Sequence, residues 1–201
     1  MLRLSHQQLD VRIDNDPSFT FGSIDNPHSY DNAYRLDEEP YTPTSLHTVM
    51  VAQDDDKPIA SCILGASGGA SGVHEHSGII HADSLLLAVG PFVASLHLPT
   101  LTLNWKLKTD WATCFGVYHS PEHRCYISHG ELDVAAVSYG GAIIWSNSGA
   151  DIFTNGFSIS NSQVTAIDWN EDRYVWDIRT GKLIETTANK AVNLSGGSGG
   201  F

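Results

Sequence analysis

Three histidines near residue 75 are the side chains whose types and spacing could do chemistry. His74 and His76 are separated by one residue, and His81 follows with Asp83 close behind. Alternate residues of a β-strand point to the same face, so His74 and His76 would present two imidazoles together. Imidazoles at this spacing suit a divalent transition metal. The pattern therefore indicates a metal site at His74, His76 and His81, with a polar strand face or turn as the simpler interpretation.

Carboxylates gather in the N-terminal third of the chain. The two runs are Asp37, Glu38 and Glu39, and Asp54, Asp55 and Asp56. A calcium loop alternates its ligands and adds a distal Glu, which the run at 54–56 lacks, so a solvated hairpin turn is expected there. The acidic density predicts a surface that binds a basic protein partner, with solubility alone as the competing explanation.

The run from Gly65 to Gly69 has the form G-x-S-x-G that surrounds the nucleophile of many hydrolases. That motif works only between a strand and a helix. Here a glycine-rich stretch follows, which favours a flexible turn. The sequence contains no phosphate-binding loop, dinucleotide fingerprint or H-E-x-x-H motif. We therefore assign no catalytic residue and favour a protein that is not an enzyme.

Composition restricts the class of protein further. The 201 residues carry 23 acidic and 11 basic side chains, a formal net charge of −12, which argues against nucleic-acid binding. The longest apolar run, residues 85–98, is too short for a membrane helix and is interrupted by Gly90 and Pro91. With no signal peptide at the N-terminus, a cytoplasmic protein without membrane contact is expected.

The secondary structure is predicted to be β throughout. Short runs rich in β-branched and aromatic residues recur from residue 9 to residue 178, separated by Gly, Asn, Asp and Pro. No stretch shows the apolar periodicity of a helix. The three cysteines, Cys62, Cys114 and Cys125, form no C-x-x-C pair, so reduced and buried thiols are expected.

An internal duplication is suggested by an offset of 71 residues. It lays residues 92–98 over 163–169 and residues 105–110 over 176–181, so that Trp105 and Trp176 would fill equivalent core positions. We expect an N-terminal arm at 1–45, β repeat units at 46–112 and 113–190, and a flexible Gly/Ser tail at 191–201. Of the other tryptophans, Trp111, Trp145 and Trp169, an exposed one would suit a binding hot spot.

Two local resemblances bear on the fold and the metal site. Residues 174–183, YVWDIRTGKL, resemble the last strand and exit turn of a WD40 blade, and Val164–Asp168 is similar to the inner part of a PQQ-type propeller blade. Propellers of these families are usually scaffolds that bind other proteins. Residues 68–76 with His81 resemble the first half of the cupin metal motif.

The expected fold is all-β, with internally duplicated antiparallel sheets in a partial β-propeller-like arrangement or a two-sheet β-sandwich. The expected function is a non-enzymatic protein-binding module, such as an acidic inhibitor or immunity-type protein for a basic partner. One alternative is a cupin-like metal-binding protein or metalloenzyme that uses the three histidines. Another is a self-assembling homo-oligomer, because exposed sheet edges must be covered.

Overall fold

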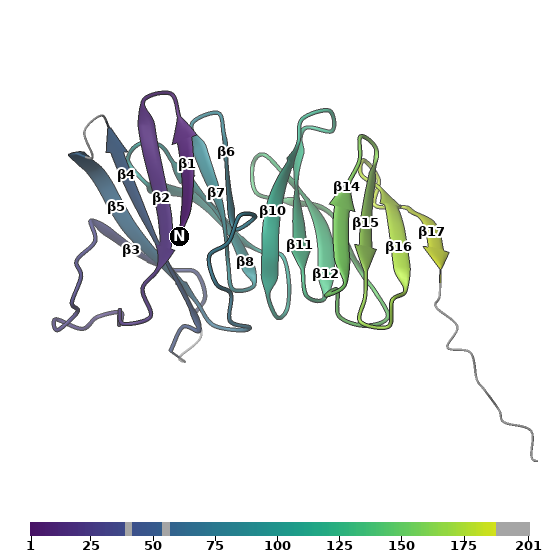
Figure 1. Ribbon diagram of the computed structural model, residues 1–201, viewed down its shortest axis with the longest axis horizontal. Coiled ribbons are helices and arrows are strands. Elements are labelled where there is room, and N and C mark those ends of the chain that lie inside the picture. The colour runs from purple at the N-terminus through teal and green to yellow at the C-terminus, as the bar shows by residue number, and fades with distance from the viewer. Residues whose placement is uncertain (39–41, 54–56, 188–201) are drawn as a thin grey trace, which may run out of the picture.

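A computed structural model describes residues 1–38, 42–53 and 57–187. All the secondary structure in these residues is β, and its strands form four sheets that stand in a row along the chain (Figure 1). The all-β prediction is therefore confirmed. The predicted tail at 191–201 lies outside the described residues.

The first sheet has the strand order β1 (Leu2–His6), β2 (Leu9–Asn15), β4 (Ser45–Gln53), β5 (Lys57–Ala66), β3 (Asn32–Arg35). The second contains β6 (Gly78–His81), β7 (Ser84–Val89), β8 (Phe92–His97) and β9 (Thr102–Lys108). The third contains β10 (Cys114–Ser120), β11 (Cys125–Gly130), β12 (Asp133–Ser138) and β13 (Ile143–Ser148). The fourth contains β14 (Gly156–Ile159), β15 (Gln163–Ile167), β16 (Arg173–Asp177) and β17 (Leu183–Thr187).

The first sheet differs from the others in its connections. β2 pairs with β4 over seven residue pairs, although β3 lies between them in the chain and joins the opposite edge of the same sheet. β3 lies parallel to β5, whereas the other strand pairs are antiparallel. Residues 1–45 are thus not a separate arm, because β1 and β2 supply two strands of the first sheet.

The repeated unit is one four-stranded sheet, and its period is 40 residues rather than 71. Leu101, Gly141 and Gly181 occupy the same turn of the second, third and fourth sheets, each with positive φ, and lie 40 residues apart. The offset of 71 lays β9, a fourth strand, over β16, a third strand. Trp105 is therefore equivalent to Trp145 and not to Trp176.

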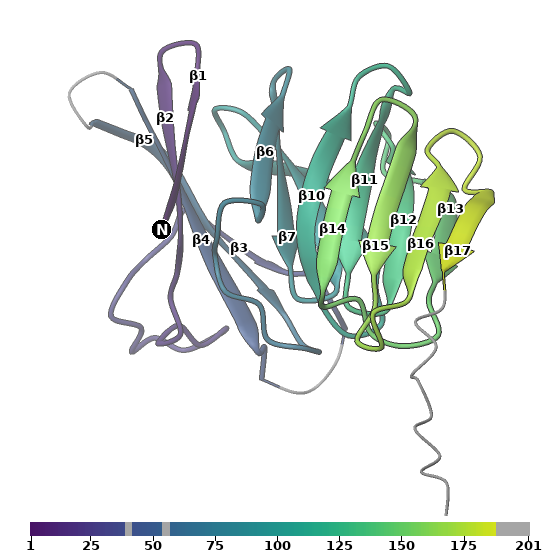
Figure 2. The ribbon, with the colours of Figure 1, turned by 45° about the vertical axis from the view of Figure 1, so that its right-hand side comes forward.

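The sheets pack face to face in succession. Figure 2 shows the fourth sheet standing in front of the third, and each pair of neighbouring sheets encloses its own apolar cluster. The partial β-propeller-like arrangement is therefore confirmed, and the two-sheet sandwich is wrong. The predicted unit at 46–112 joins part of the first sheet to the second, and the unit at 113–190 contains the third and fourth.

The strand patterns follow from this packing. In β7, Leu85 and Leu87 face the first sheet while Leu86 faces the third, so the strand reads as a continuous apolar run. β15 alternates, because only Val164 and Ala166 face a neighbouring sheet. The three cysteines are buried as free thiols, one in each apolar cluster, as expected.

An aromatic side chain at the outer rim of each of the first three sheets reaches the next sheet. It donates a hydrogen bond to a carbonyl in the turn before the last strand of that sheet. The three bonds run from Tyr34 Oη to Leu101 O (3.0 Å), from Trp105 Nε1 to Tyr139 O (3.2 Å) and from Trp145 Nε1 to Ile178 O (2.6 Å). These rim contacts fix the position of each sheet, along the direction of its strands, relative to the next sheet.

Replacing Gly181 with Ala should destabilise the contact between the third and fourth sheets. The new Cβ would lie 2.5 Å from the Trp145 ring, at a backbone φ of +68° that L-residues rarely adopt. We expect a loss of about 3 kcal/mol in the free energy of unfolding, measured by urea denaturation.

The matched control is Gly22→Ala, which has a similar φ of +78° but nothing within 4 Å of the new Cβ. It should cost only the backbone strain, about 1 kcal/mol. Equal losses in the two variants would show that the rim contact contributes little.

Candidate functional site

One end of the sheets collects the segments that join each sheet to the next. Because the strands run up and down, these linkers lie at the same end as the turns between the second and third strands of each sheet. We call this end the linker face. Its segments are residues 67–77, 109–113, 131–132, 149–155 and 168–172.

Backbone hydrogen bonds connect the segments of the linker face from sheet to sheet. They run from Gly69 N to Ala112 O (2.9 Å), from Glu131 N to Thr113 O (2.7 Å), from Phe153 N to Glu131 O (2.7 Å) and from Trp169 N to Ile152 O (2.8 Å). The linker face is therefore an ordered surface.

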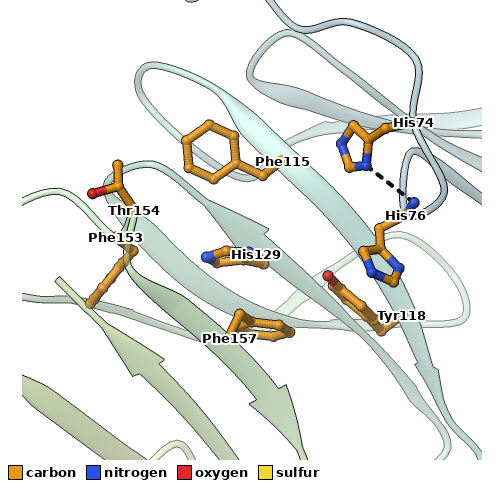
Figure 3. Close-up of a pocket in the computed structure, with 8 residues that line it drawn as sticks. All are labelled: His74, His76, Phe115, Tyr118, His129, Phe153, Thr154 and Phe157. Carbon is orange, nitrogen blue, oxygen red and sulfur yellow. Dashed lines mark hydrogen bonds between the residues drawn. The ribbon is translucent and has the colours of Figure 1, made fainter. Parts of the chain in front are cut away.

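A cavity of about 450 Å³ opens on this face between the 67–77 linker, the third sheet and the fourth sheet (Figure 3). Its lining combines aromatic rings with imidazoles. The lining residues are His74, His76, Phe115, Tyr118, His129, Phe153, Thr154 and Phe157.

Five of these rings contact one another in series, and we call them the aromatic cup. The members, in order, are His76, Tyr118, Phe157, His129 and Phe115. The successive distances between ring centroids are 5.0, 4.9, 4.1 and 5.5 Å. His129 and Phe157 stack almost parallel, with 10° between their planes. A continuous wall of rings therefore surrounds the cavity.

A β-bulge places two members of the cup. Residues 115 and 118 would point to opposite faces of a regular strand, but the pairing of β10 with β11 shifts register between Cys114 and Gly116. This shift lets Phe115 and Tyr118 line the same cavity. Gly116 then allows the linker to approach, because a Cβ there would lie 2.9 Å from the Cβ of His76.

Two partly buried polar members of the cup, His129 and Tyr118, are uncharged at neutral pH. Burial, together with a smaller effect of the neighbouring His76 and His74, lowers the pKa of His129 to about 4. Burial raises the pKa of Tyr118 to about 12, with added effects from Cys114 and Glu75. The His129 Nε2 atom is shielded from solvent and has no hydrogen-bond partner among the described residues. His129 and Tyr118 therefore add no charge to the cup at neutral pH.

Of the three histidines predicted to bind a metal, His74 and His76 lie together in the 67–77 linker, with ring centroids 6.1 Å apart, but His81 does not join them. His76 stacks on Tyr118, whereas His81 stacks on His119 at 4.0 Å and is hydrogen-bonded to the Tyr126 hydroxyl at 2.8 Å. Tyr118 and His119 are adjacent in β10 and point to opposite faces of the third sheet. His76 and His81 are therefore separated by that sheet, and the described part of the chain contains no group of three His, Cys, Asp or Glu placed to hold a metal ion.

The predicted acidic surface is described only in part. Glu39 and Asp54, Asp55 and Asp56 lie outside the described residues. Glu38 is exposed, but the Asp37 side chain is only 7% exposed and accepts hydrogen bonds from Arg35 Nε and Ser67 N. Asp37 is therefore occupied within the fold. Gly65 is the last residue but one of β5, which ends at Ala66, and Gly69 lies in the linker that follows, so the G-x-S-x-G run is not followed by a helix.

Two tryptophans stand out on the linker face. Trp111 and Trp169 are 75% and 64% exposed, whereas Trp145 and Trp176 are buried. The Lys108 ammonium lies 4.6 Å from the centre of the Trp111 ring. The sequence raised an exposed tryptophan only as a general possibility. The cup itself was missed, because its rings come from two different sheets and the 67–77 linker, and part of their arrangement depends on a bulge.

Comparisons with known proteins bear on the fold alone. No family model and no curated protein matches the chain. Among solved structures, the computationally designed Ika8 protein is similar with a TM-score of 0.50 and 14% identity, over 70% of this chain and 46% of that one. The AfRom2 CNH domain is similar with a TM-score of 0.47 and 14% identity, over 74% of this chain and 49% of that one.

The chain therefore spans just under half of each of these two structures. Neither comparison tests membership of the WD40 or PQQ-type families, which stays a prediction. In residues 1–38, 42–53 and 57–187, no helix is long and apolar enough to span a membrane.

Acid should destabilise the fold through His129. The unfolded chain takes up a proton on this imidazole below a pKa of about 6.5, whereas the folded chain does so only near 4. Stability is therefore lost as the pH falls from 6.5 towards 4. In His129→Phe, which cannot titrate, we expect the loss between pH 7 and 4.5 to be smaller by about 2 kcal/mol.

Urea denaturation at the two pH values measures this difference. His97→Gln, which removes an imidazole from an exposed position of β8, is the control and should behave as the wild type. An identical loss in the wild type and His129→Phe would mean that His129 is not held uncharged by the fold.

Proposed function

We propose that the protein is a non-enzymatic binding module that docks a basic protein on its linker face. The observation that carries the proposal is the presence of Trp111 and Trp169, both largely exposed, on the same face as the aromatic cup. Tryptophans exposed in a free protein and buried in a complex are frequent hot spots of binding. Exposed aromatic groups gathered on one face indicate an interaction site.

The backbone around Trp169 is held in place before any partner arrives. Its N–H donates to Ile152 O, and the Asn155 side-chain amide donates to its carbonyl at 3.3 Å. The buried carboxylate of Asp168 accepts two further backbone N–H groups of the same turn. A preorganised turn loses less conformational entropy on binding, which favours affinity.

Charge favours a basic partner. Glu75, Asp151 and Glu171 are exposed in the linker-face segments, and the whole chain carries a formal charge of −12. Such a field attracts a cationic protein and speeds encounter with it. We therefore propose the linker face as the partner site, in place of the N-terminal acidic runs, because Asp37 is occupied within the fold. The buried free thiols fit the reducing cytoplasm that we propose as the location.

The test is affinity capture from the native cells with three baits: the wild type, the double variant Trp111→Ala with Trp169→Ala, and the control Ile144→Ala. Ile144 is 49% exposed and lies near the start of β13, at the end of the third sheet opposite the linker face. We expect the wild type and the control to retain the same Lys/Arg-rich polypeptide, quantified by mass spectrometry. The double variant should retain at least about tenfold less, the usual effect of removing hot spots.

Raising the salt concentration should weaken capture, because the attraction between charged surfaces is screened. A partner retained equally by the double variant would exclude the linker face as its binding site. A retained partner that is acidic would contradict the proposed chemistry.

A further inference from the structure

We propose that the aromatic cup binds an alkylammonium cation, and that this cation is a methylated lysine side chain of the basic partner. The identity of the carrier rests on the proposed function, whereas the binding of the cation itself can be tested without any partner.

The rings offer the surface that attracts an organic cation. Phe115, Tyr118 and Phe157 surround the cavity, and the neutral imidazole of His129 closes the series between two of them (Figure 3). The faces of aromatic rings carry negative electrostatic potential and attract quaternary ammonium groups. Several rings around one cavity allow a cation to contact more than one face at once.

The charge near the cup favours a cation over an anion. The exposed Glu75 carboxylate lies 3.4 Å from His76 Nε2, beside the cavity. The chain as a whole is strongly acidic. His129 adds no positive charge at neutral pH, because burial holds its pKa near 4. An anionic ligand would meet ring faces and a carboxylate, both of which repel it.

The scarcity of hydrogen-bonding groups favours a methylated cation. An unmodified lysine ammonium has three N–H donors, each of which needs an acceptor once it leaves water. Several of the polar atoms in the lining are already engaged or shielded: His74 Nδ1 accepts the His76 backbone N–H, His76 Nε2 lies 3.4 Å from the Glu75 carboxylate, and His129 Nε2 is shielded from solvent. The Tyr118 and Thr154 hydroxyls are the main acceptors that remain. A trimethylammonium group has no N–H donor, so it loses no hydrogen bond on entering. The cavity of about 450 Å³ has room for such a group with part of its alkyl stem.

The first experiment compares choline with its uncharged isostere 3,3-dimethylbutan-1-ol by NMR titration of the full chain. The two probes have the same shape and differ in charge. We expect choline to bind with a dissociation constant about tenfold lower, because a cation–π contribution is added to the same apolar burial. Equal binding of the two probes, or tighter binding of the alcohol, would overturn the proposal in favour of a simple apolar pocket.

Variants place the binding in the cup. Phe157→Leu keeps an apolar side chain but removes a ring face, and should weaken choline binding at least about fivefold. Phe115→Leu is the second variant, used if Phe157→Leu does not fold. Ile144→Ala removes an exposed apolar side chain outside the cup and should leave choline binding unchanged. Equal weakening by Ile144→Ala and Phe157→Leu would show that choline binding does not depend on the cup and would contradict the proposal.

The last arm identifies the carrier of the cation. A basic peptide that contains trimethyllysine should bind more tightly than choline and more tightly than the same peptide with unmodified lysine. Equal affinity of the two peptides would overturn the assignment to a methylated side chain, even where choline binds. The two proposals can be told apart by the double tryptophan variant. If this variant loses partner capture but still binds choline, the tryptophans carry the partner and the cup carries the cation.

Discussion

Contact between the faces of successive sheets is the interaction on which the rest of this molecule depends. A four-stranded sheet of this length has two faces, and burying both requires a neighbour on each side. The second and third sheets obtain this, and their central strands are accordingly apolar on both faces. The rim aromatics then set the register between sheets, since each indole or phenol must meet one turn carbonyl. Residues far apart in the chain are positioned at the linker face only because this register is fixed.

A buried carboxylate connects the segments of the linker face at the junction of two sheets. Asp110, between the second and third sheets, accepts N–H groups from Ala112 and Thr113 and also from the turn at 132–133. The turn can approach because residue 130 is glycine, where a Cβ would lie 2.1 Å from Asp110 Oδ2. Some of the acidic residues thus serve as hydrogen-bond acceptors that hold loops in place. This explains why the number of acidic residues alone did not locate a partner surface.

The all-β class followed from local patterns that the fold preserves, namely short β-branched runs and Gly, Asn and Pro turns. The repeat period did not follow, because matching Trp105 to Trp176 compares a rim residue with a core residue of different strands. Its true equivalent, Trp145, shares a role that appears only when the next sheet is present: contact with a glycine of positive φ. The separation of His76 from His81 was missed for a similar reason. Alternation predicts which residues share a strand face, but His81 is separated from His76 by a sheet that belongs to a later part of the chain.

The outer face of the fourth sheet shows how such a row can present a polar end. Glu185 occupies the position that Trp105 and Trp145 hold in the two preceding sheets, and it is hydrogen-bonded to Arg173 at 3.1 Å. A further sheet packed on this face would bury that ion pair, and the desolvation of two charges offsets much of what the contact would gain. The fourth sheet also has Glu185, and not an indole, at the position that would donate a hydrogen bond to a turn carbonyl of the added sheet. The fourth sheet thus gives little support to a row extended by a second copy at this face. The linker face, in contrast, runs along the side of the row of sheets and not at its end. Its exposed aromatic groups are the better candidates for binding another molecule.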